Sequence, residues 1–260
     1  MRLKDEVAII TGGSRGIGRA LAVEFAREGA RVTLAARSQA ELEETERQVQ
    51  AVGGRALVVP TDLVKAEDVD AMVAATRRAF GSVDILVNNA GIAGPTALCE
   101  DVKPEDWDYT MAVNVKGPFL CCRAVLREMK ERRKGRIINI GSVSSKRPLV
   151  QRTPYTTGKM GLIGFTRTLA AEVGECGITV NIICPGPVSG PRIESVLSNM
   201  AKATGKTPDQ VAHEMFLQHA ALRRFVDAED VARLAVFLAS EAGRSMTGQD
   251  INVTAGLIMY

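Results

Sequence analysis

Seven short apolar segments rich in β-branched residues alternate with longer segments of helical periodicity, and this alternation leaves few possible folds. Short, continuously apolar strands are typical of parallel sheets, in which both faces are buried. Parallel strands joined through helices form βαβ units with right-handed crossovers. The sequence therefore predicts an α/β fold with a doubly wound, seven-stranded parallel sheet and helices on both faces. Strands are expected at 6–11, 31–36, 56–60, 83–88, 136–141, 178–184 and 249–254.

Helical patterns fill the intervals between the predicted strands, and one interval is longer than a crossover requires. Segment 187–226 opens with Pro187, Gly190 and Pro191 and then becomes helical. Because it is too long for an ordinary loop, we expect a substrate-binding lid inserted into one domain that spans 1–260. Helices are expected at 16–28, 39–52, 66–80, 105–134, 154–175 and 228–240.

Composition and charge argue against several classes of protein. A formal net charge of +3 over 260 residues is too small to indicate nucleic-acid binding. No apolar run reaches the roughly 18 residues of a membrane span, and the first residues lack a signal-peptide pattern. The five cysteines form no CxxC pair, which argues against disulfides and zinc. We therefore expect a cytoplasmic protein without a metal, and with neither nucleic acid nor membrane as a partner.

A glycine-rich turn follows the first predicted strand and opens the first predicted helix. Ligands of open α/β sheets bind outside the carboxyl ends of the strands, where this turn lies. Glycines let the backbone approach a pyrophosphate, which rests on the helix N-terminus. The alternative is a turn that serves only tight packing, but its place between strand and helix favours a dinucleotide site. The candidate cofactor residues of this turn are Gly12, Ser14, Arg15, Gly16, Ile17 and Gly18.

The residue after the second predicted strand bears on which nicotinamide cofactor is bound. A carboxylate there would bind the ribose 2′-OH of NAD, but this chain has Arg37, whose guanidinium suits a 2′-phosphate. Arg15 can reach the same phosphate. We therefore expect NADP(H) to be preferred, with NAD(H) possible. After the third strand, Asp62 suits a hydrogen bond from the adenine amine, although it could instead be the N-cap of helix 66–80.

Polar residues, glycine or proline also follow the next three predicted strands. Asn88 to Gly91 follow the fourth strand, Ser142 follows the fifth, and Pro185 and Gly186 follow the sixth. A purely structural explanation would have to account for all six strand ends separately, whereas one bound cofactor explains them together. The further cofactor candidates are Leu63, Asn89, Ala90, Gly91, Pro185, Gly186, Val188 and Ser189.

Tyr155 precedes Lys159 by four residues, so the two side chains share one face of a helix. Thr153 is the predicted N-cap and Pro154 the first helical residue, which places Tyr155 in the first turn. The helix dipole and the lysine both favour phenolate over phenol, so the pair could transfer a proton near neutral pH. Taken alone, the spacing is more often that of a surface pair.

The motifs together resemble the short-chain dehydrogenase/reductase family over essentially the whole chain. TGGSRGIG (11–18) is similar to that family's cofactor loop, NNAG (88–91) to its sheet-stabilising motif, and Pro185-Gly186 to the motif bordering the nicotinamide. The resemblance implies one Rossmann domain, usually assembled as a homotetramer, and an NAD(P)-dependent oxidoreductase that interconverts a secondary alcohol and a carbonyl.

The resemblance also implies four catalytic residues. Tyr155 would exchange the proton at the substrate oxygen, and Ser142 would hydrogen-bond the same oxygen. Lys159 would lower the pKa of Tyr155 and bind the nicotinamide ribose, while Asn114 would position a water in a proton relay. Tyr155 and Lys159 are therefore also cofactor candidates. The presence of all four residues argues against a regulator that keeps the fold without catalysis.

A basic loop between Ser142 and Tyr155 in the sequence bears on the chemical class of the substrate. Lys146, Arg147 and Arg152 lie in this loop without an acidic residue, which predicts a polar, anionic substrate, although a solvated charge run is an alternative. Arg192, beyond the nicotinamide motif, is a further candidate on the lid side.

Two narrower functions within the family stay open as alternatives. One is a 3-oxoacyl-carrier-protein reductase, which docks its acidic carrier on two basic residues. Arg133 matches one of these positions, but the other is Cys176. The second alternative is an NAD-dependent sugar or polyol dehydrogenase.

Overall fold

The computed structural model describes residues 1–260, apart from the side chains of Arg192 and Ala203. All seven strands are parallel and form one sheet in the order β3-β2-β1-β4-β5-β6-β7. The predicted doubly wound α/β fold is therefore confirmed. The order reverses between β1 and β4, which is where ligands bind in such sheets. The strands are β1 (Val7–Thr11), β2 (Arg31–Ala36), β3 (Arg55–Pro60), β4 (Ile85–Asn88), β5 (Gly135–Ile140), β6 (Ile178–Pro185) and β7 (Asp250–Val253).

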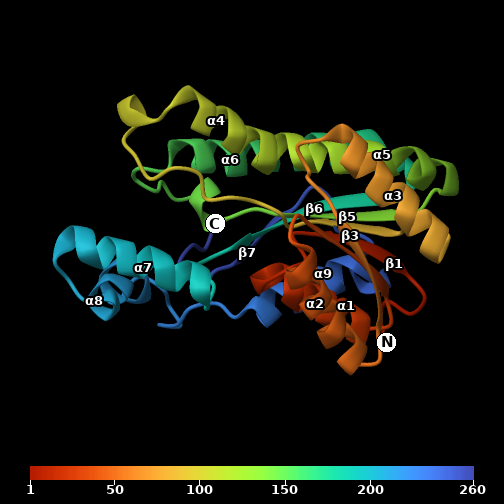
Figure 1. Ribbon diagram of the computed structural model, residues 1–260, viewed down its shortest axis with the longest axis horizontal. Coiled ribbons are helices and arrows are strands. Elements are labelled where there is room, and N and C mark those ends of the chain that lie inside the picture. The colour runs from red at the N-terminus through yellow and green to blue at the C-terminus, as the bar shows by residue number, and fades with distance from the viewer.

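Helices cover both faces of the sheet, as Figure 1 shows. One face is covered by α1 (Gly16–Arg27), α2 (Gln39–Ala51) and α9 (Ala228–Ala239). The other face is covered by α3 (Ala66–Phe80), α4 (Pro104–Met111), α5 (Gly117–Arg132) and α6 (Thr153–Val173). Beside the sheet lie α7 (Pro191–Thr204) and α8 (Pro208–Ala212).

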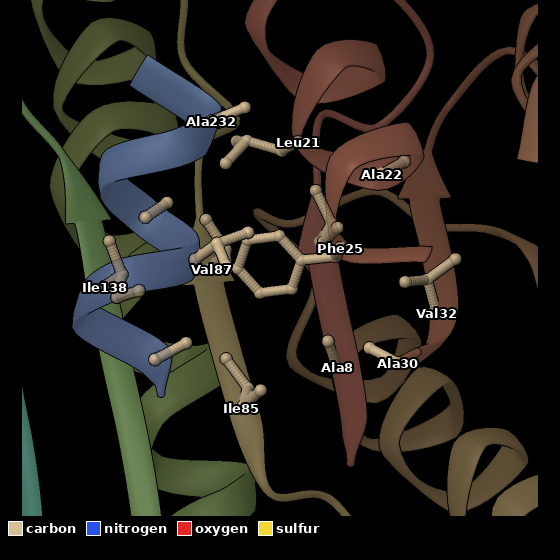
Figure 2. Packing of buried hydrophobic residues seen from close by; sticks show 14 of the residues in the cluster. Ala8, Leu21, Ala22, Phe25, Ala30, Val32, Ile85, Val87, Ile138 and Ala232 are labelled. Carbon is tan, nitrogen blue, oxygen red and sulfur yellow. The ribbon is translucent and has the colours of Figure 1, made fainter. Parts of the chain in front are cut away.

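Successive residues of β1 point into two different hydrophobic cores. Ala8 and Ile10 belong to the core under α1 and α9, and Ile9 to the core under α3 and α5. Phe25 of α1 is fully buried in the first of these cores (Figure 2). Burial of such a ring stabilises the fold by about 1.5–3 kcal/mol. It also fixes α1 against the sheet, so the first turn of this helix stays at the carboxyl edge.

The predicted helix 105–134 is interrupted. It divides into α4 and α5, separated by the π-helical turn η2 (Ala112–Lys116), which carries Asn114 at its centre. Pro118 explains the interruption, because a proline has no N–H to donate to the carbonyl four residues earlier. In a continuous α-helix, the backbone carbonyl of Asn114 would therefore receive no hydrogen bond from residue 118.

The predicted helix cap at Thr153 is wrong, and so is the alternative role of Asp62 as a helix cap. The N-cap of α6 is Arg152, and Thr153 is already helical, with its hydroxyl buried and without a hydrogen-bond partner in the described part of the chain. Tyr155 still lies in the first turn. The N-cap of α3 is Lys65 rather than Asp62, whose carboxylate accepts the Val64 N–H at 3.3 Å. Asp62 is therefore not the N-cap of α3.

Segment 187–226 is closed at its base and has its own small core. Val188 bridges Val226, and the Val226 N–H donates to Pro187 O at 2.9 Å. Its buried apolar cluster is separate from the cores of the sheet and comprises Leu197, Ala201, Val211 and Ala212. Its role as a lid stays a prediction. Among the described residues, none of the helices has the length and apolar character that crossing a bilayer requires.

Candidate active site

The glycine turn after β1 has the geometry of a phosphate-binding loop. Gly12 and Gly16 adopt φ values of +65° and +53°, which residues with a side chain rarely take. A Cβ at Gly18 would lie 1.9 Å from Gly12 O, so only glycine lets α1 start this close to the turn. Within the described residues no side chain caps the first N–H groups of α1. These groups are therefore available to an anion.

Asn89 and Thr11 hold the glycine turn in place. The Asn89 amide donates to Thr11 O at 2.9 Å and to Gly12 O at 3.1 Å. In return, the buried Thr11 hydroxyl accepts the backbone N–H groups of Asn89 and Ala90, at 3.1 and 3.2 Å. The NNAG segment after β4 thereby shapes the loop after β1. Sequence reasoning missed Thr11, although its place at the end of a buried strand could have signalled it.

The two candidate arginines at the adenosine end are both on the surface. Arg15 lies 3.7 Å from the Glu41 carboxylate, with both side chains exposed. The Arg37 guanidinium donates to the hydroxyl of Tyr109 at 3.0 Å, across 72 residues of sequence. Sequence reasoning missed Tyr109, and no local pattern signals it. Of the two candidates after β3, Leu63 lies at the start of α5, because a Cβ at Gly117 would lie 3.4 Å from the Leu63 Cβ, and Asp62 immediately precedes it.

Asn114 is completely buried and bound at both ends of its amide. Its Nδ2 donates to Ile92 O at 3.0 Å, and its Oδ1 accepts the Ile92 N–H at 2.9 Å. These bonds fix the segment after β4 to the π-helical turn. Gly158 of α6 packs directly on this turn, where an added Cβ would lie 3.3 Å from the Asn114 Cβ.

Lys159 is buried at the carboxyl end of β5. Its Nζ donates to Ile140 O at 2.7 Å and lies 5.9 Å from the centre of the Tyr155 ring. A Cβ at Gly91 would lie 3.4 Å from this Nζ and 3.0 Å from the Asn114 Oδ1. The ammonium group, the asparagine amide and the NNAG backbone therefore converge at one point.

Ser142 begins a tight turn that packs against α6. Its Oγ accepts the Ser144 N–H at 3.1 Å and donates to the Ser144 hydroxyl at 3.2 Å. The Ser145 hydroxyl donates to Ser142 O at 2.6 Å. Because α6 contacts both this turn and the turn of Asn114, it gathers the four candidate catalytic residues at one edge of the sheet.

The residues after β6 line up beside the end of β7. The Gly186 N–H donates to Val253 O at 2.8 Å, and a Cβ at Gly186 would lie 3.0 Å from the Thr254 Cα. The Ser189 N–H donates to Val226 O at 2.9 Å. Pro185, Gly186, Val188 and Ser189 therefore lie at the same carboxyl edge, where segment 187–226 begins.

The basic loop divides into two kinds of residue. Lys146 is bound to Asp250 of β7, with 3.1 Å between Nζ and the carboxylate, so its charge is neutralised within the fold. Arg152 donates to Ala93 O at 3.3 Å and thereby borders the segment after β4. Arg147 is half-buried in the same loop. The candidate Arg192 lies outside the described side chains.

These features fit a nicotinamide dinucleotide. The open N-terminus of α1 offers N–H groups to the pyrophosphate, and the exposed Arg37 lies at the end of β2, where the adenosine ribose of such cofactors binds. Lys159 and the Tyr155 ring lie near each other at the end of β5, at the same edge of the sheet. These groups lie along the carboxyl edge of the sheet, on both sides of the point between β1 and β4 where the strand order reverses.

Comparison with known proteins also indicates an enzyme that binds a nicotinamide dinucleotide. Residues 6–201 match the family model described as short chain dehydrogenase. The chain is 37% identical over 260 residues to a 3-oxoacyl-[acyl-carrier-protein] reductase of Synechocystis sp., covering 99% of both chains. It is 36% identical over 253 residues to a D-beta-hydroxybutyrate dehydrogenase of Rhizobium meliloti, covering 96% of this chain and 98% of the relative.

Solved structures share the fold over nearly the full length. Actinorhodin polyketide ketoreductase with NADPH superposes with a TM-score of 0.94 at 33% identity, covering 98% of each chain. NAD+-bound xylitol dehydrogenase superposes with a TM-score of 0.93 at 29% identity, covering 98% of this chain and 100% of the other. The chain therefore belongs to the short-chain dehydrogenase/reductase family, whose members are NAD(P)-dependent oxidoreductases acting on CH–OH and carbonyl groups.

Proposed function

We propose that this enzyme uses Tyr155 as its general acid and base, prefers NADP(H), and acts on a polar, anionic hydroxy or keto compound. The observation that carries the catalytic part is the convergence at Gly91. Lys159 Nζ and Asn114 Oδ1 would lie 3.4 and 3.0 Å from a Cβ there, and Tyr155 stands one helical turn before Lys159. A cation, an amide and a phenol around one point suit proton transfer at a carbonyl oxygen.

Each of the four residues has a distinct task in this mechanism. The Tyr155 hydroxyl gives a proton to the substrate oxygen in reduction and takes it back in oxidation. The Ser142 hydroxyl donates a hydrogen bond to the same oxygen as charge develops there. Lys159, held by Ile140 O at 2.7 Å, favours the phenolate form of Tyr155. The bound nicotinamide supplies or accepts the hydride.

Asn114 has the remaining task of orienting water. Its amide keeps the segment after β4 next to Lys159 through two hydrogen bonds with Ile92. In the proposed relay, a water beside this turn returns protons to Lys159 and Tyr155 from solvent.

Arg37 supports the preference for NADP(H). The chain has an arginine at the end of β2, where a carboxylate would select NAD, and the exposed Arg37 guanidinium can bind a 2′-phosphate with two hydrogen bonds. Arg15 is exposed next to Glu41 on the adjacent turn and adds positive charge. Measuring kcat/KM with NADPH and NADH tests this part. Equal values, or a preference for NADH, would show that neither arginine binds the phosphate.

Arg147 and Arg152 support an anionic substrate. They lie between Ser142 and Tyr155 in sequence, and Arg152 contacts the segment after β4, which borders the site. An arginine fork suits carboxylate or phosphate. The name of the second relative, a D-beta-hydroxybutyrate dehydrogenase, describes a hydroxy acid as substrate.

A 3-oxoacyl-carrier-protein reductase is the second candidate function, because one relative is named so. Arg133 and the turn holding Cys176 lie together, since the Arg133 guanidinium donates to Glu175 O at 2.5 Å. Only one of the two expected cations is therefore present at this surface. If a carrier-bound substrate were preferred and Arg133→Ala weakened it alone, this second function would replace the first.

The decisive experiment for the catalytic proposal compares two variants. Tyr155→Phe removes the proton and keeps the ring, so kcat should fall by at least a hundredfold while NADPH still binds. Lys159→Ala should lose both turnover and NADPH binding, because in this proposal Lys159 also binds the cofactor. Turnover by Tyr155→Phe near the wild-type rate would refute the role of Tyr155.

The substrate proposal needs a matched pair of compounds, one hydroxy acid and its neutral ester or amide. Arg147→Ala and Arg152→Ala should each narrow the ratio of kcat/KM between the acid and the neutral compound. Arg127→Ala, an exposed arginine on the outer part of α5, is the control. If neither loop variant narrows the ratio, the substrate is a neutral ketone or alcohol.

A further inference from the structure

One hydrogen bond connects opposite layers of the molecule at the adenosine end of the candidate site. The Arg37 Nη1 at the end of β2 donates to the Oη of Tyr109 in α4, at 3.0 Å. Both residues are exposed, with 44% of the Tyr109 surface accessible. Arg37 leads into α2 on one face of the sheet, whereas α4 lies on the other (Figure 1). The bond therefore crosses the carboxyl edge rather than running along it.

Arg37 lies between the two loops that flank the predicted adenosine ribose. On one side, the Gly12 N–H donates to Ala35 O at 2.7 Å. On the other side, the Thr61 N–H donates to Ala36 O at 2.9 Å, just before Asp62. The start of the Arg37 side chain is thus fixed by the sheet, while its long, exposed end has free rotamers unless something holds it.

Tyr109 is itself held in a fixed place. It stands in the last turn of α4, next to the buried Thr110, whose Oγ1 would lie 2.8 Å from a Cβ at Gly94. Gly94 belongs to the segment that follows β4 and borders the site. The backbone that carries the Tyr109 side chain is therefore packed against the segment that borders the candidate catalytic residues.

We propose that Tyr109 is a positioning residue for cofactor choice, which rests on the proposed NADP(H) preference. Its hydroxyl occupies one of the five N–H donors of Arg37 and leaves the others for the 2′-phosphate. Because the guanidinium is already ordered before the cofactor binds, less side-chain entropy is lost on binding. The benefit goes to NADP(H) alone, since NAD(H) has no phosphate at this position.

Two other roles for the Tyr109 hydroxyl would give different results in binding measurements. If the Tyr109 hydroxyl competed with the phosphate for Arg37, removal of the hydroxyl would tighten NADPH binding. If the hydroxyl had only a structural role in α4, its removal would change NADPH and NADH binding equally and would lower the melting temperature. Neither pattern is expected from a positioning residue.

The test measures equilibrium binding of NADPH and NADH to the whole enzyme by nucleotide fluorescence. The variants are Tyr109→Phe, Arg37→Ala and the double variant, with Tyr260→Phe as the control because it removes a hydroxyl from another exposed tyrosine. For Tyr109→Phe we expect the NADPH Kd to rise about three- to tenfold, the size of one net hydrogen bond. The NADH Kd should change less than about twofold, and kcat at saturating NADPH should stay close to wild type.

The double variant completes the test. In the Arg37→Ala background, Tyr109→Phe should have no further effect on NADPH binding, because the two residues act as one unit. A full additional loss there, tighter NADPH binding, or equal effects on both nucleotides would overturn the role of Tyr109. If Arg37→Ala lowers the preference for NADPH but Tyr109→Phe does not, only this inference fails. If Arg37→Ala leaves the preference unchanged, the proposed NADP(H) selection fails as well.

Discussion

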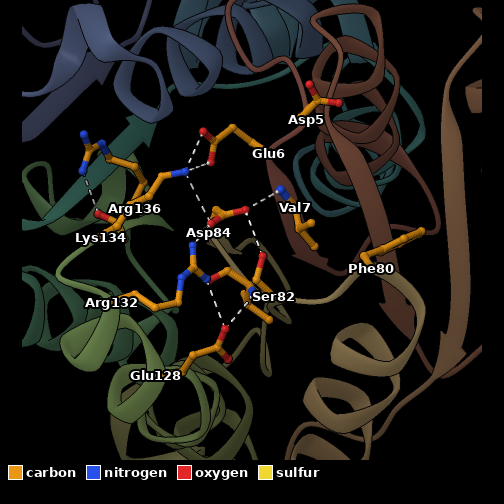
Figure 3. Close-up of polar contacts among 12 residues, drawn as sticks. Asp5, Glu6, Val7, Phe80, Ser82, Asp84, Glu128, Arg132, Lys134 and Arg136 are labelled. Carbon is orange, nitrogen blue, oxygen red and sulfur yellow. Dashed lines mark hydrogen bonds and ion pairs between the residues drawn. The ribbon is translucent and has the colours of Figure 1, made fainter.

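Replacement of Asp84 by asparagine should destabilise the fold and leave the active site unchanged. Asp84 is buried just before β4, at the amino edge of the sheet, opposite the candidate site. Figure 3 shows its carboxylate at the centre of a polar network. It accepts the Val7 N–H at 2.9 Å, is bound by the Arg132 guanidinium, and lies 3.5 Å from Lys134 Nζ. The carboxylate thereby joins the start of β1 to the end of α5.

The loss of stability depends on which ion pairs Arg132 and Lys134 keep when the Asp84 carboxylate is removed. A hydrogen bond to a charged group contributes about 1.5–3 kcal/mol. Arg132 is 31% exposed and keeps Glu128 at 3.1 Å, while Lys134 keeps Glu6 at 2.8 Å. Neither cation is left buried and unpaired, so the losses do not add. We expect Asp84→Asn to lower the free energy of unfolding by about 2–3 kcal/mol and the Tm by about 4–12 °C.

The pH dependence gives an independent check. Burial by itself would raise the pKa of Asp84, but hydrogen bonds from Arg132 and the Val7 N–H, together with the charge of Lys134, lower that pKa overall. A lowered folded-state pKa means that the contribution is complete above the unfolded value, about 3.9, and is lost as the pH falls through the folded value.

Urea denaturation at fixed protein concentration, across a range of pH, measures both effects. The gap in unfolding free energy between wild type and Asp84→Asn should be constant from pH 6 to 8 and should close only below about pH 4. The NADPH Kd of the folded variant should equal that of wild type. A gap under about 0.5 kcal/mol at pH 7, the range of an ordinary surface substitution, would refute the assigned role of Asp84.

Two further predictions concern the frame of the site. Gly18→Ala should weaken NADPH binding at least tenfold, because its Cβ would lie 1.9 Å from Gly12 O, whereas Gly161→Ala, in open space within α6, should bind normally and gain about 0.5–1 kcal/mol of stability; nucleotide titration and urea denaturation of both variants check this. Lys146→Met should lower kcat several-fold with little change in the NADPH Kd, since Lys146 ties the turn after Ser142 to Asp250. Normal turnover by that variant would show that the turn needs no such tie.

The strands and the position of the site were predictable from the sequence, and the reason is geometric. Parallel strands all end at one edge of the sheet, so residues that follow the strands meet there whatever their distance along the chain. Asn114 follows no strand end, so it was assigned to the site only by the family resemblance; in the structure its Oδ1 and the Lys159 Nζ would lie 3.0 and 3.4 Å from a Cβ at Gly91. The strand ends thus predicted the edge of the sheet, and the family resemblance supplied the individual catalytic candidates.

Three features of the structure were not predicted from the sequence, and one of them is a tertiary contact. The interruption of helix 105–134 depends on Pro118, whose missing N–H could have been read as a signal. Thr153 is not the N-cap because α6 begins at Thr153 itself, one residue earlier than predicted, and Arg152 occupies the cap position. The bond between Arg37 and Tyr109 joins residues that no periodicity relates. Contacts of this kind follow from the packing of whole helices, which the local sequence does not specify.

The difference between these two sets of residues bears on how such an enzyme can change its substrate. Asn114 and Lys159 are buried and hydrogen-bonded to backbone groups of Ile92 and Ile140. Backbone partners do not depend on the identity of neighbouring side chains, so we expect the proposed proton-transferring geometry to tolerate changes in those side chains. Arg147, by contrast, lies in a loop with a partly accessible side chain. The relatives have different named substrates, and we propose that loop residues such as Arg147, rather than the buried catalytic candidates, determine which substrate this chain selects.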